Sequence, residues 1–274
     1  MTHAETADWF RARHHRKPLL LLPNAWDGAS ARMFAAAGFE AIATTSGGLA
    51  WSLGYPDGEH APWDEVLAAT RRIVRAARVP VTADIEAGYA DTPQELGRHI
   101  AEIIATGVVG VNLEDGLHDA PHIRDAADAQ RRIDAARAAA TREGVPIVIN
   151  ARSDLYLFNL RDEATRFSET VARGKAYIAA GADCVYPMGL RDPAVIARFV
   201  PEVGAPVNIT GRAGMPDAAT FERMGVARIT IASAPTLVAM SAVKALAEQL
   251  KADGKFDNLA AGVRHPDAQA LFAT

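Results

Sequence analysis

Short apolar runs alternate with longer amphipathic stretches along the whole chain. The short runs are rich in leucine or β-branched residues and are bounded by Gly, Pro or charge, which predicts buried parallel strands. They cover residues 19–23, 41–46, 79–86, 108–114, 146–152, 183–187, 206–210 and 228–232. The main stretches with helical spacing cover residues 63–78, 93–106, 126–141, 162–180 and 192–200. Eight strand–helix alternations without a linker predict an α/β fold, a closed (β/α)₈ TIM barrel.

A doubly wound open sheet is the alternative α/β architecture. It would place a Gly-rich phosphate-binding turn after the first strand, but residues 23–27 read Pro-Asn-Ala-Trp-Asp there. Local signals agree with the helix limits. Thr92-Pro93-Gln94-Glu95 resembles a capping box, and Ala-Ala-Gly at 36–38 and 179–181 is typical of a helix end.

Two segments lie outside the eight units of this single predicted domain, residues 1–274. Residues 4–16 are expected to form a short helix before the first strand. Residues 256–272 follow the last barrel helix and carry several large apolar side chains, namely Phe256, Leu259, Val263, Leu271 and Phe272. Such a segment must pack on the outside of the barrel or on a partner subunit, because exposed apolar surface is costly in water.

Composition narrows the class of protein. A length of 274 residues suits one barrel domain, and a net charge of −4 gives no footprint for nucleic acid or an anionic membrane. Cys184 is the one cysteine, which excludes an intrachain disulfide and a cysteine-rich metal site. The charged N-terminus is unlike a signal peptide, and no apolar run reaches the length of a membrane helix. A cytoplasmic location is therefore expected.

Polar residues gather at the predicted C-terminal ends of the strands, where barrels place their chemistry. Strand residues two apart share a face, and three such pairs occur at successive strand ends: Asp84 with Glu86, Asn112 with Glu114, and Asn150 with Arg152. Carboxylates that converge repel one another unless they are protonated or bridged by a cation, and Mg²⁺ is a hard ion that binds one or two carboxylates and several waters. The pattern predicts a magnesium site in the mouth of the barrel.

Two further features of the mouth favour an acidic substrate. Arg152 would offer a planar fork to a substrate carboxylate. Ser46-Gly47-Gly48 after the second strand would expose backbone N–H groups to a carboxylate or enolate oxygen.

In six segments the chain resembles the isocitrate lyase/phosphoenolpyruvate mutase superfamily, over roughly residues 15–240. These segments cover residues 23–27, 44–48, 54–57, 83–89, 112–115 and 150–154. The resemblance implies a barrel whose C-terminal helix is exchanged between two subunits, with 256–272 as a dimerisation segment. It also implies a homodimer or a dimer of dimers.

The resemblance further implies residue roles. Mg²⁺, with Mn²⁺ as an alternative, would bind chiefly Asp84, with nearby acids acting mostly through water, namely Asp57, Glu86 and Glu114. Substrate contacts would come from Ser46, Gly47, Gly48, Arg152 and Asn208. Catalytic roles would fall to Arg152, Glu114 and His118.

The chain also departs from that family. Isocitrate and methylisocitrate lyases carry a loop with lysine and a proton-donating cysteine, whereas residues 115–122 read Asp-Gly-Leu-His-Asp-Ala-Pro-His. The gate residues of the phosphonate enzymes are absent from the same loop. Pro187-Met188-Gly189 stands where lyases carry a glutamate. His118 and Tyr89 are the candidate proton donors by loop position, and a lyase acting on a tricarboxylate is disfavoured.

These features predict a Mg²⁺-dependent carbon–carbon lyase or hydrolase that acts on a small 2-oxo or 2-hydroxy di- or tricarboxylate through an enolate-type intermediate. Oxaloacetate-like and 2-substituted malate-like acids fit this expectation. A phosphonopyruvate-type P–C bond enzyme is one alternative, although a trianionic phosphonate would require more cationic side chains than this mouth offers. A weakly active 2-oxo acid binder is the other.

Overall fold

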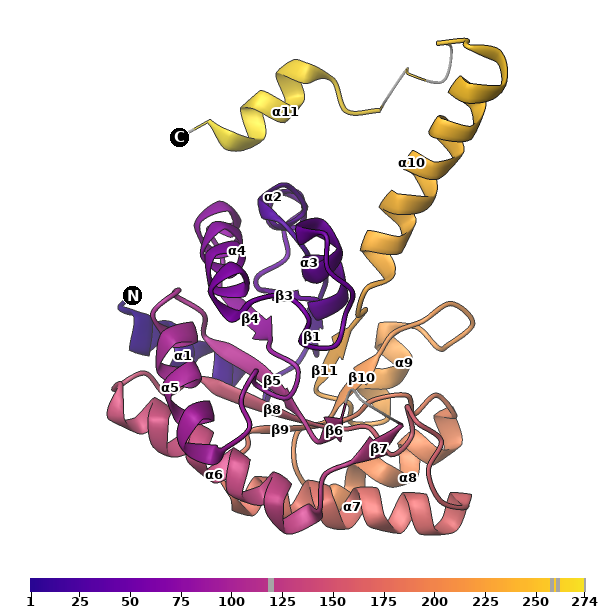
Figure 1. Ribbon diagram of the computed structural model, residues 1–274. Helices are drawn as coiled ribbons and strands as arrows, with labels where there is room; N and C mark the ends of the chain where they lie inside the picture. The colour runs from indigo at the N-terminus through magenta and orange to yellow at the C-terminus, as the bar shows by residue number, and fades with distance from the viewer. Residues whose placement is uncertain (118–120, 257–258, 260–261, 274) are drawn as a thin grey trace.

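The computed structural model describes residues 1–117, 121–256, 259 and 262–273. Its parallel strands form a closed ring (Figure 1). One sheet runs β1 (Leu20–Leu22), β11 (Arg228–Thr230), β10 (Asn208–Thr210), and the other runs β2 (Asn24–Ala25), β3 (Ile42–Thr44), β4 (Val81–Asp84), β5 (Gly110–Glu114), β8 (Val148–Ser153), β9 (Cys184–Pro187). The two sheets join because β1 continues into β2 through Pro23, and a parallel bridge links Val185 to Val207. The predicted (β/α)₈ barrel is confirmed.

Helices surround the strands (Figure 1), and α1, α4, α5, α6, α7 and α8 lie at the helical stretches predicted from the sequence. They are α1 (His3–Arg13), α2 (Gly28–Ala36), α3 (Ser46–Leu53), α4 (Trp63–Ala77), α5 (Pro93–Ile104), α6 (Ala126–Arg142), α7 (Glu163–Ala179), α8 (Pro193–Val203), α9 (Ala218–Arg223), α10 (Ala234–Asp253) and α11 (His265–Phe272). A short antiparallel hairpin, β6 (Gly116–Leu117) and β7 (His122–Ile123), follows β5. Apolar side chains of strands and inward helix faces form the core between them.

The start of α5 shows how local sequence sets a boundary. Thr92 Oγ1 accepts a hydrogen bond from Glu95 N at 3.2 Å, which satisfies one unpaired N–H of the first turn. The reciprocal bond differs from a full capping box, because Glu95 Oε2 accepts from Asp91 N instead of Thr92 N. Gly38 and Gly181, with φ of 92° and 103°, follow helix ends in the left-handed conformation that favours glycine.

The strand predicted at residues 79–86 is shorter than expected, because β4 ends at Asp84. Glu86 has a φ of 52° and lies in a turn, which ends the extended backbone. The alternation rule therefore does not apply between Asp84 and Glu86, and the position of Glu86 depends on the loop.

Helix α10 leaves the barrel as a long arm, and α11 returns beyond α2 (Figure 1). Thr236 is the only buried residue of the twenty in α10. The chain end contacts its own barrel, since Arg32 Nε donates to Leu271 O at 2.6 Å. No helix within the described residues is long and apolar enough to cross a membrane.

Candidate active site

A pocket of about 220 Å³ opens where β4, β5 and β8 end. Its described lining consists of Ser46, Asp57, Gly58, His60, Glu86, Glu114, Arg152, Asp154, Leu157 and Phe158. Five residues predicted from the sequence are thus brought together here. The position agrees with the C-terminal face at which barrel enzymes carry their active sites.

Arg152 is the cation of this pocket. The register of β5 and β8 places it directly opposite Glu114, and Arg152 Nη1 lies 2.5 Å from Glu114 Oε2. Its Nε and Nη2 donate to the two carboxylate oxygens of Asp154 at 2.6 and 2.9 Å. Burial disfavours the cation, but the charges of Asp154 and Glu114 outweigh burial and raise the pKa of Arg152. Two buried acids thus share the guanidinium that the sequence pattern predicts to face a substrate carboxylate.

Asp84 ends β4 with one carboxylate oxygen uncommitted. Its Oδ2 accepts a 3.3 Å hydrogen bond from Ser46 N at the first turn of α3. Its Oδ1 is buried and has no hydrogen-bond partner within the part of the chain that the structure describes. A buried unsatisfied oxygen costs on the order of 1–3 kcal/mol, so this atom is a natural position for a cation or an ordered water.

Glu86 is held by a reciprocal network between two loops. Its carboxylate accepts hydrogen bonds from Tyr89 Oη at 2.8 Å and from Glu59 N at 3.1 Å. Glu59 Oε1 in turn accepts from Tyr89 N at 2.6 Å. All three residues have a φ between 52° and 60°, which costs on the order of 1–3 kcal/mol for each non-glycine residue. The network fixes this strained backbone and places the Glu86 side chain in the pocket.

Burial, and next the charges of neighbouring acids, raise the pKa values of three carboxyl groups in the pocket. Burial, and next the charge of Asp57, raise the pKa of Glu86 to about 8. Loss of hydration and the charge of Asp84 also raise the pKa of Asp57, whose side chain stays accessible at the mouth. Burial raises the pKa of Glu114 against the opposing charge of Arg152. A divalent cation would favour the ionised forms.

The donor set fits a hard ion bound largely through water. Among the residues that the structure places, no three His, Cys, Asp or Glu side chains are arranged to hold one metal ion together. Mg²⁺ keeps several waters and takes one or two carboxylates, so the uncommitted Asp84 Oδ1 with acids at longer range suits it.

The raised pKa of Glu86 predicts a pH dependence of stability without metal. Between about pH 4.5 and pH 8 the folded protein binds a proton at Glu86 that the unfolded chain releases, so the free energy of unfolding falls as pH rises. The slope from this one group is at most about 1.4 kcal/mol per pH unit. Urea denaturation in chelator across pH 5 to 9 should show this slope, and Glu86→Gln should reduce it. Glu202→Gln, an exposed change on α8, is the control and should keep it. An unchanged slope in Glu86→Gln would contradict the proton assignment.

The remaining predicted substrate contacts lie behind the pocket wall. Gly47 and Gly48 are buried in the first turn of α3, and close approaches explain both glycines. A Cβ at Gly47 would lie 2.9 Å from Asp57 Oδ2, and one at Gly48 would collide with Thr45 and with Thr236 of α10. Ser46 alone of this trio reaches the pocket lining.

Two other predicted residues need separate mention. Asn208 is buried inside the barrel and donates to Thr230 Oγ1 at 3.1 Å, so it is outside the described pocket lining. His118 lies outside the described residues.

Five residues of the described pocket lining, Gly58 among them, were not predicted as site residues from the sequence. Asp154 follows Arg152 by two positions, so the alternation rule used for the other pairs could have assigned it. His60 follows the Asp57 loop, and Leu157 and Phe158 follow β8. Nothing in local sequence brings these three to the mouth, because irregular loops without periodicity carry them.

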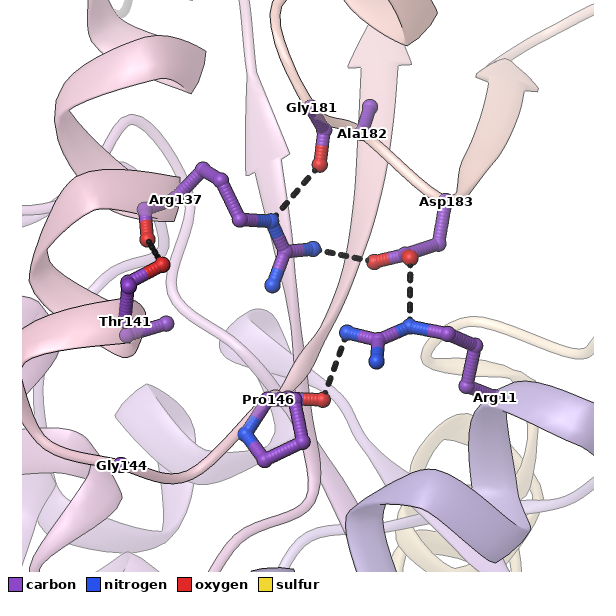
Figure 2. Close-up of a pocket in the computed structure, with 9 residues that line it drawn as sticks. Arg11, Arg137, Thr141, Gly144, Pro146, Gly181, Ala182 and Asp183 are labelled. Atoms are coloured by element: carbon purple, nitrogen blue, oxygen red, sulfur yellow. Dashed lines mark hydrogen bonds and ion pairs between the residues drawn. The ribbon is translucent and has the colours of Figure 1, made fainter.

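A larger hollow of about 560 Å³ lies at the opposite end of the barrel (Figure 2). Figure 2 shows Arg11 and Arg137 converging on Asp183, with contacts of 2.7 and 2.5 Å. Asp183 also accepts from Ile149 N at 2.8 Å, and both arginines donate to backbone carbonyls nearby. The charges are thus satisfied within the chain, and this N-terminal face is the one that barrels use for stability.

Comparison with known proteins agrees with this geometry. The family model described as phosphoenolpyruvate phosphomutase matches residues 10–251. An uncharacterized protein of Mycobacterium tuberculosis (strain ATCC 25618 / H37Rv) is 34% identical over 235 residues, 82% of each chain. The 2-methylisocitrate lyase of Escherichia coli (strain K12) is 30% identical over 222 residues, 78% of this chain and 72% of the relative.

A solved structure shows the same arrangement of the chain. The crystal structure of 2,3-dimethylmalate lyase, described as a PEP mutase/isocitrate lyase superfamily member, superposes with a TM-score of 0.86 at 26% identity. The match covers 97% of this chain and 94% of that one. The chain therefore belongs to the phosphoenolpyruvate mutase/isocitrate lyase superfamily, a group of lyases and mutases.

Proposed function

We propose that this protein is a Mg²⁺-dependent carbon–carbon lyase or hydrolase that acts on a small 2-oxo or 2-hydroxy carboxylate through an enolate-type intermediate. The observation that carries the proposal is the uncommitted, buried Asp84 Oδ1 within a cluster of acids beside the Arg152 cation. Two of the relatives are named as lyases, which supports cleavage of a carbon–carbon bond over cleavage of a P–C bond.

In this proposal Asp84 holds the metal ion directly, and Mn²⁺ is an alternative to Mg²⁺. Asp57, Glu86 and Glu114 surround it and act mostly through water. When bound, the ion supplies positive charge that stabilises the negative charge of an enolate.

The chain's own groups bind and orient the substrate. Three of the five N–H donors of Arg152 are committed to Asp154 and Glu114, so two can contact a substrate carboxylate. Ser46, which lines the pocket, begins α3, and the helix dipole favours an anion at this end of the helix. Together they would hold one end of the substrate before the acids.

We assign the proton transfer to His60. Among the described residues that line the pocket, His60 is the histidine, and an imidazole ring can both accept and donate a proton, which suits general acid–base catalysis. Tyr89 is less suited, because burial and the charge of Glu86 raise its pKa and its hydroxyl donates to Glu86.

Turnover assays of the metal-loaded protein test the function. We expect cleavage of oxaloacetate-like or 2-substituted malate-like acids, abolished by chelation and restored by Mg²⁺. Turnover of phosphonopyruvate instead would support the P–C alternative. Tight binding of 2-oxo acids without turnover of any of them would support the binder.

We also propose that α10 and residues 256–272 pack on a second copy of the chain. Four large side chains on α10 are exposed, Leu237, Val238, Met240 and Val243, and so is Phe256 beyond it. Light scattering should give a dimer or a dimer of dimers, and Val238→Glu with Val243→Glu should lower the mass. Lys244→Glu changes charge at a polar position of the same helix and should leave the mass unchanged. A monomeric parent, or a double variant with the parent mass, would refute this packing.

A further inference from the structure

The turn that follows β8 forms an apolar side of the pocket. Residues 155–159 are a turn, closed by hydrogen bonds from Phe158 N to Asp154 O at 2.9 Å and from Leu160 N to Leu155 O at 3.0 Å. Leu155 is fully buried beneath the turn, whereas Leu157 and Phe158 line the pocket. Leu157 keeps 37% of its surface exposed although it stands beside a cluster of charges. Core packing alone does not account for an apolar side chain in that position.

Close backbone approaches fix this turn in place. A Cβ at Gly189, which has a φ of 91°, would lie 2.6 Å from Leu157 N and 2.7 Å from Leu157 Cα. On the other side, a Cβ at Gly116 would lie 3.4 Å from Phe158 Cε2 and would collide with the Asp154 carboxylate. Glycines on two neighbouring loops therefore let the turn approach closely, so Leu157 and Phe158 form a fixed wall.

The charges opposite that wall limit what can occupy the pocket. The described lining holds four acids, Asp57, Glu86, Glu114 and Asp154, against one cation, Arg152. That cation is shared already by two of the acids. One divalent ion and the remaining donors of Arg152 can serve a substrate with two carboxylates. A third carboxylate directed toward Leu157 and Phe158 would lose its hydration without gaining a partner.

We propose that Leu157 and Phe158 are specificity-determining residues that receive an alkyl substituent of the substrate and reject a carboxylate in its place. The proposal rests on the proposed function and narrows it to an alkyl-substituted 2-oxo or 2-hydroxy dicarboxylate. The substrate's carboxylates face Arg152 and the acid cluster, and its alkyl group covers the two apolar side chains. The size of a pocket of about 220 Å³ suits such a small acid.

Binding of inert acids tests the wall without requiring turnover. Calorimetry of the Mg²⁺-loaded protein should rank dimethylmalonate above malonate and malonate above tricarballylate. Leu157→Ala and Phe158→Ala should each remove about tenfold of the advantage of dimethylmalonate, which corresponds to the loss of roughly one or two methylene contacts. Leu160→Ala, in the same loop but outside the described lining, should keep the parent ranking. Leu157→Arg should reverse the order of malonate and tricarballylate.

The outcomes separate the wall from the proposed reaction. The parent ranking, lost in the two alanine variants, supports the wall even if no carbon–carbon bond is cleaved. Equal losses for all three acids in both variants would make the turn structural and overturn the specificity assignment. Failure of the parent to bind any of the acids, or preference for tricarballylate, would overturn it as well. If unsubstituted acids were turned over and the wall variants had no effect, the lyase function would be supported and the specificity assignment would be overturned.

Discussion

Replacing Asp84 with alanine is expected to abolish Mg²⁺ binding and turnover while the barrel stays folded. Asp84 Oδ1 is a buried oxygen without a hydrogen-bond partner among the described residues, and Oδ2 makes one 3.3 Å contact with Ser46 N. Removing the carboxylate takes away the direct ligand, so Mg²⁺ affinity should fall by more than about a hundredfold, beyond the effect of losing an outer contact. It also relieves repulsion among the acids, so stability without metal should not fall. Calorimetry with Mg²⁺ and circular dichroism measure the two effects.

The control for Asp84 is Asp91→Ala, which removes an exposed carboxylate in the loop before α5. It should bind Mg²⁺ as the parent does. Asp84→Asn, which keeps the shape but not the charge, should also lose the ion. Parent-like Mg²⁺ affinity in Asp84→Ala would show that the main ligand lies elsewhere.

Replacing Arg152 with methionine should destabilise the protein and also weaken substrate binding. Arg152 neutralises Asp154 and Glu114, whose side chains are 1% and 2% exposed. Leaving buried carboxylates without their partner costs about 3–5 kcal/mol. Arg152→Lys should lose less stability, since the charge remains, but should bind 2-oxo dicarboxylates about tenfold to a hundredfold more weakly because the two N–H donors left for the substrate are lost. Urea denaturation and ligand calorimetry separate the two quantities.

Arg98→Met is the matched control for Arg152. Arg98 pairs with Glu95 at the surface with 70% of its side chain exposed, and such pairs contribute little to stability. Its unfolding free energy should stay within about 0.5 kcal/mol of the parent. If Arg152→Met unfolded like this control, its contacts with the two acids would carry no net stability.

Much of the fold could be predicted because burial imposes a period on the sequence. Residues 81–83 form a continuous buried run, and α5 buries one apolar face at helical spacing, so the two patterns predict a strand and a helix. What could not be predicted arises where the backbone departs from regular conformations. Glu86 reaches the pocket through a left-handed turn tied to Glu59, and no alternation rule describes that conformation.

It was harder to predict which site residues pair with one another than to predict which residues belong to the site. The spacing placed Glu114 and Arg152 in one mouth, and the register of β5 and β8 brings them into contact. The sequence did not indicate that Asp154 would bind the guanidinium fork, because strand alternation assigns a face to each side chain but not its ion-pair partner. His60 carried no periodic signal.

Gly48 also affects the position of the far end of α10. It sits where α10 starts, since a Cβ there would collide with Thr236. A helix of 20 residues is about 30 Å long, so a displacement of about 1 Å across its first turn swings the far end by roughly 5 Å. The start of α10 lies beside the first turn of α3, which also carries Ser46 into the pocket. A residue larger than glycine at position 48 would therefore displace the start of α10 and change the position of its far end.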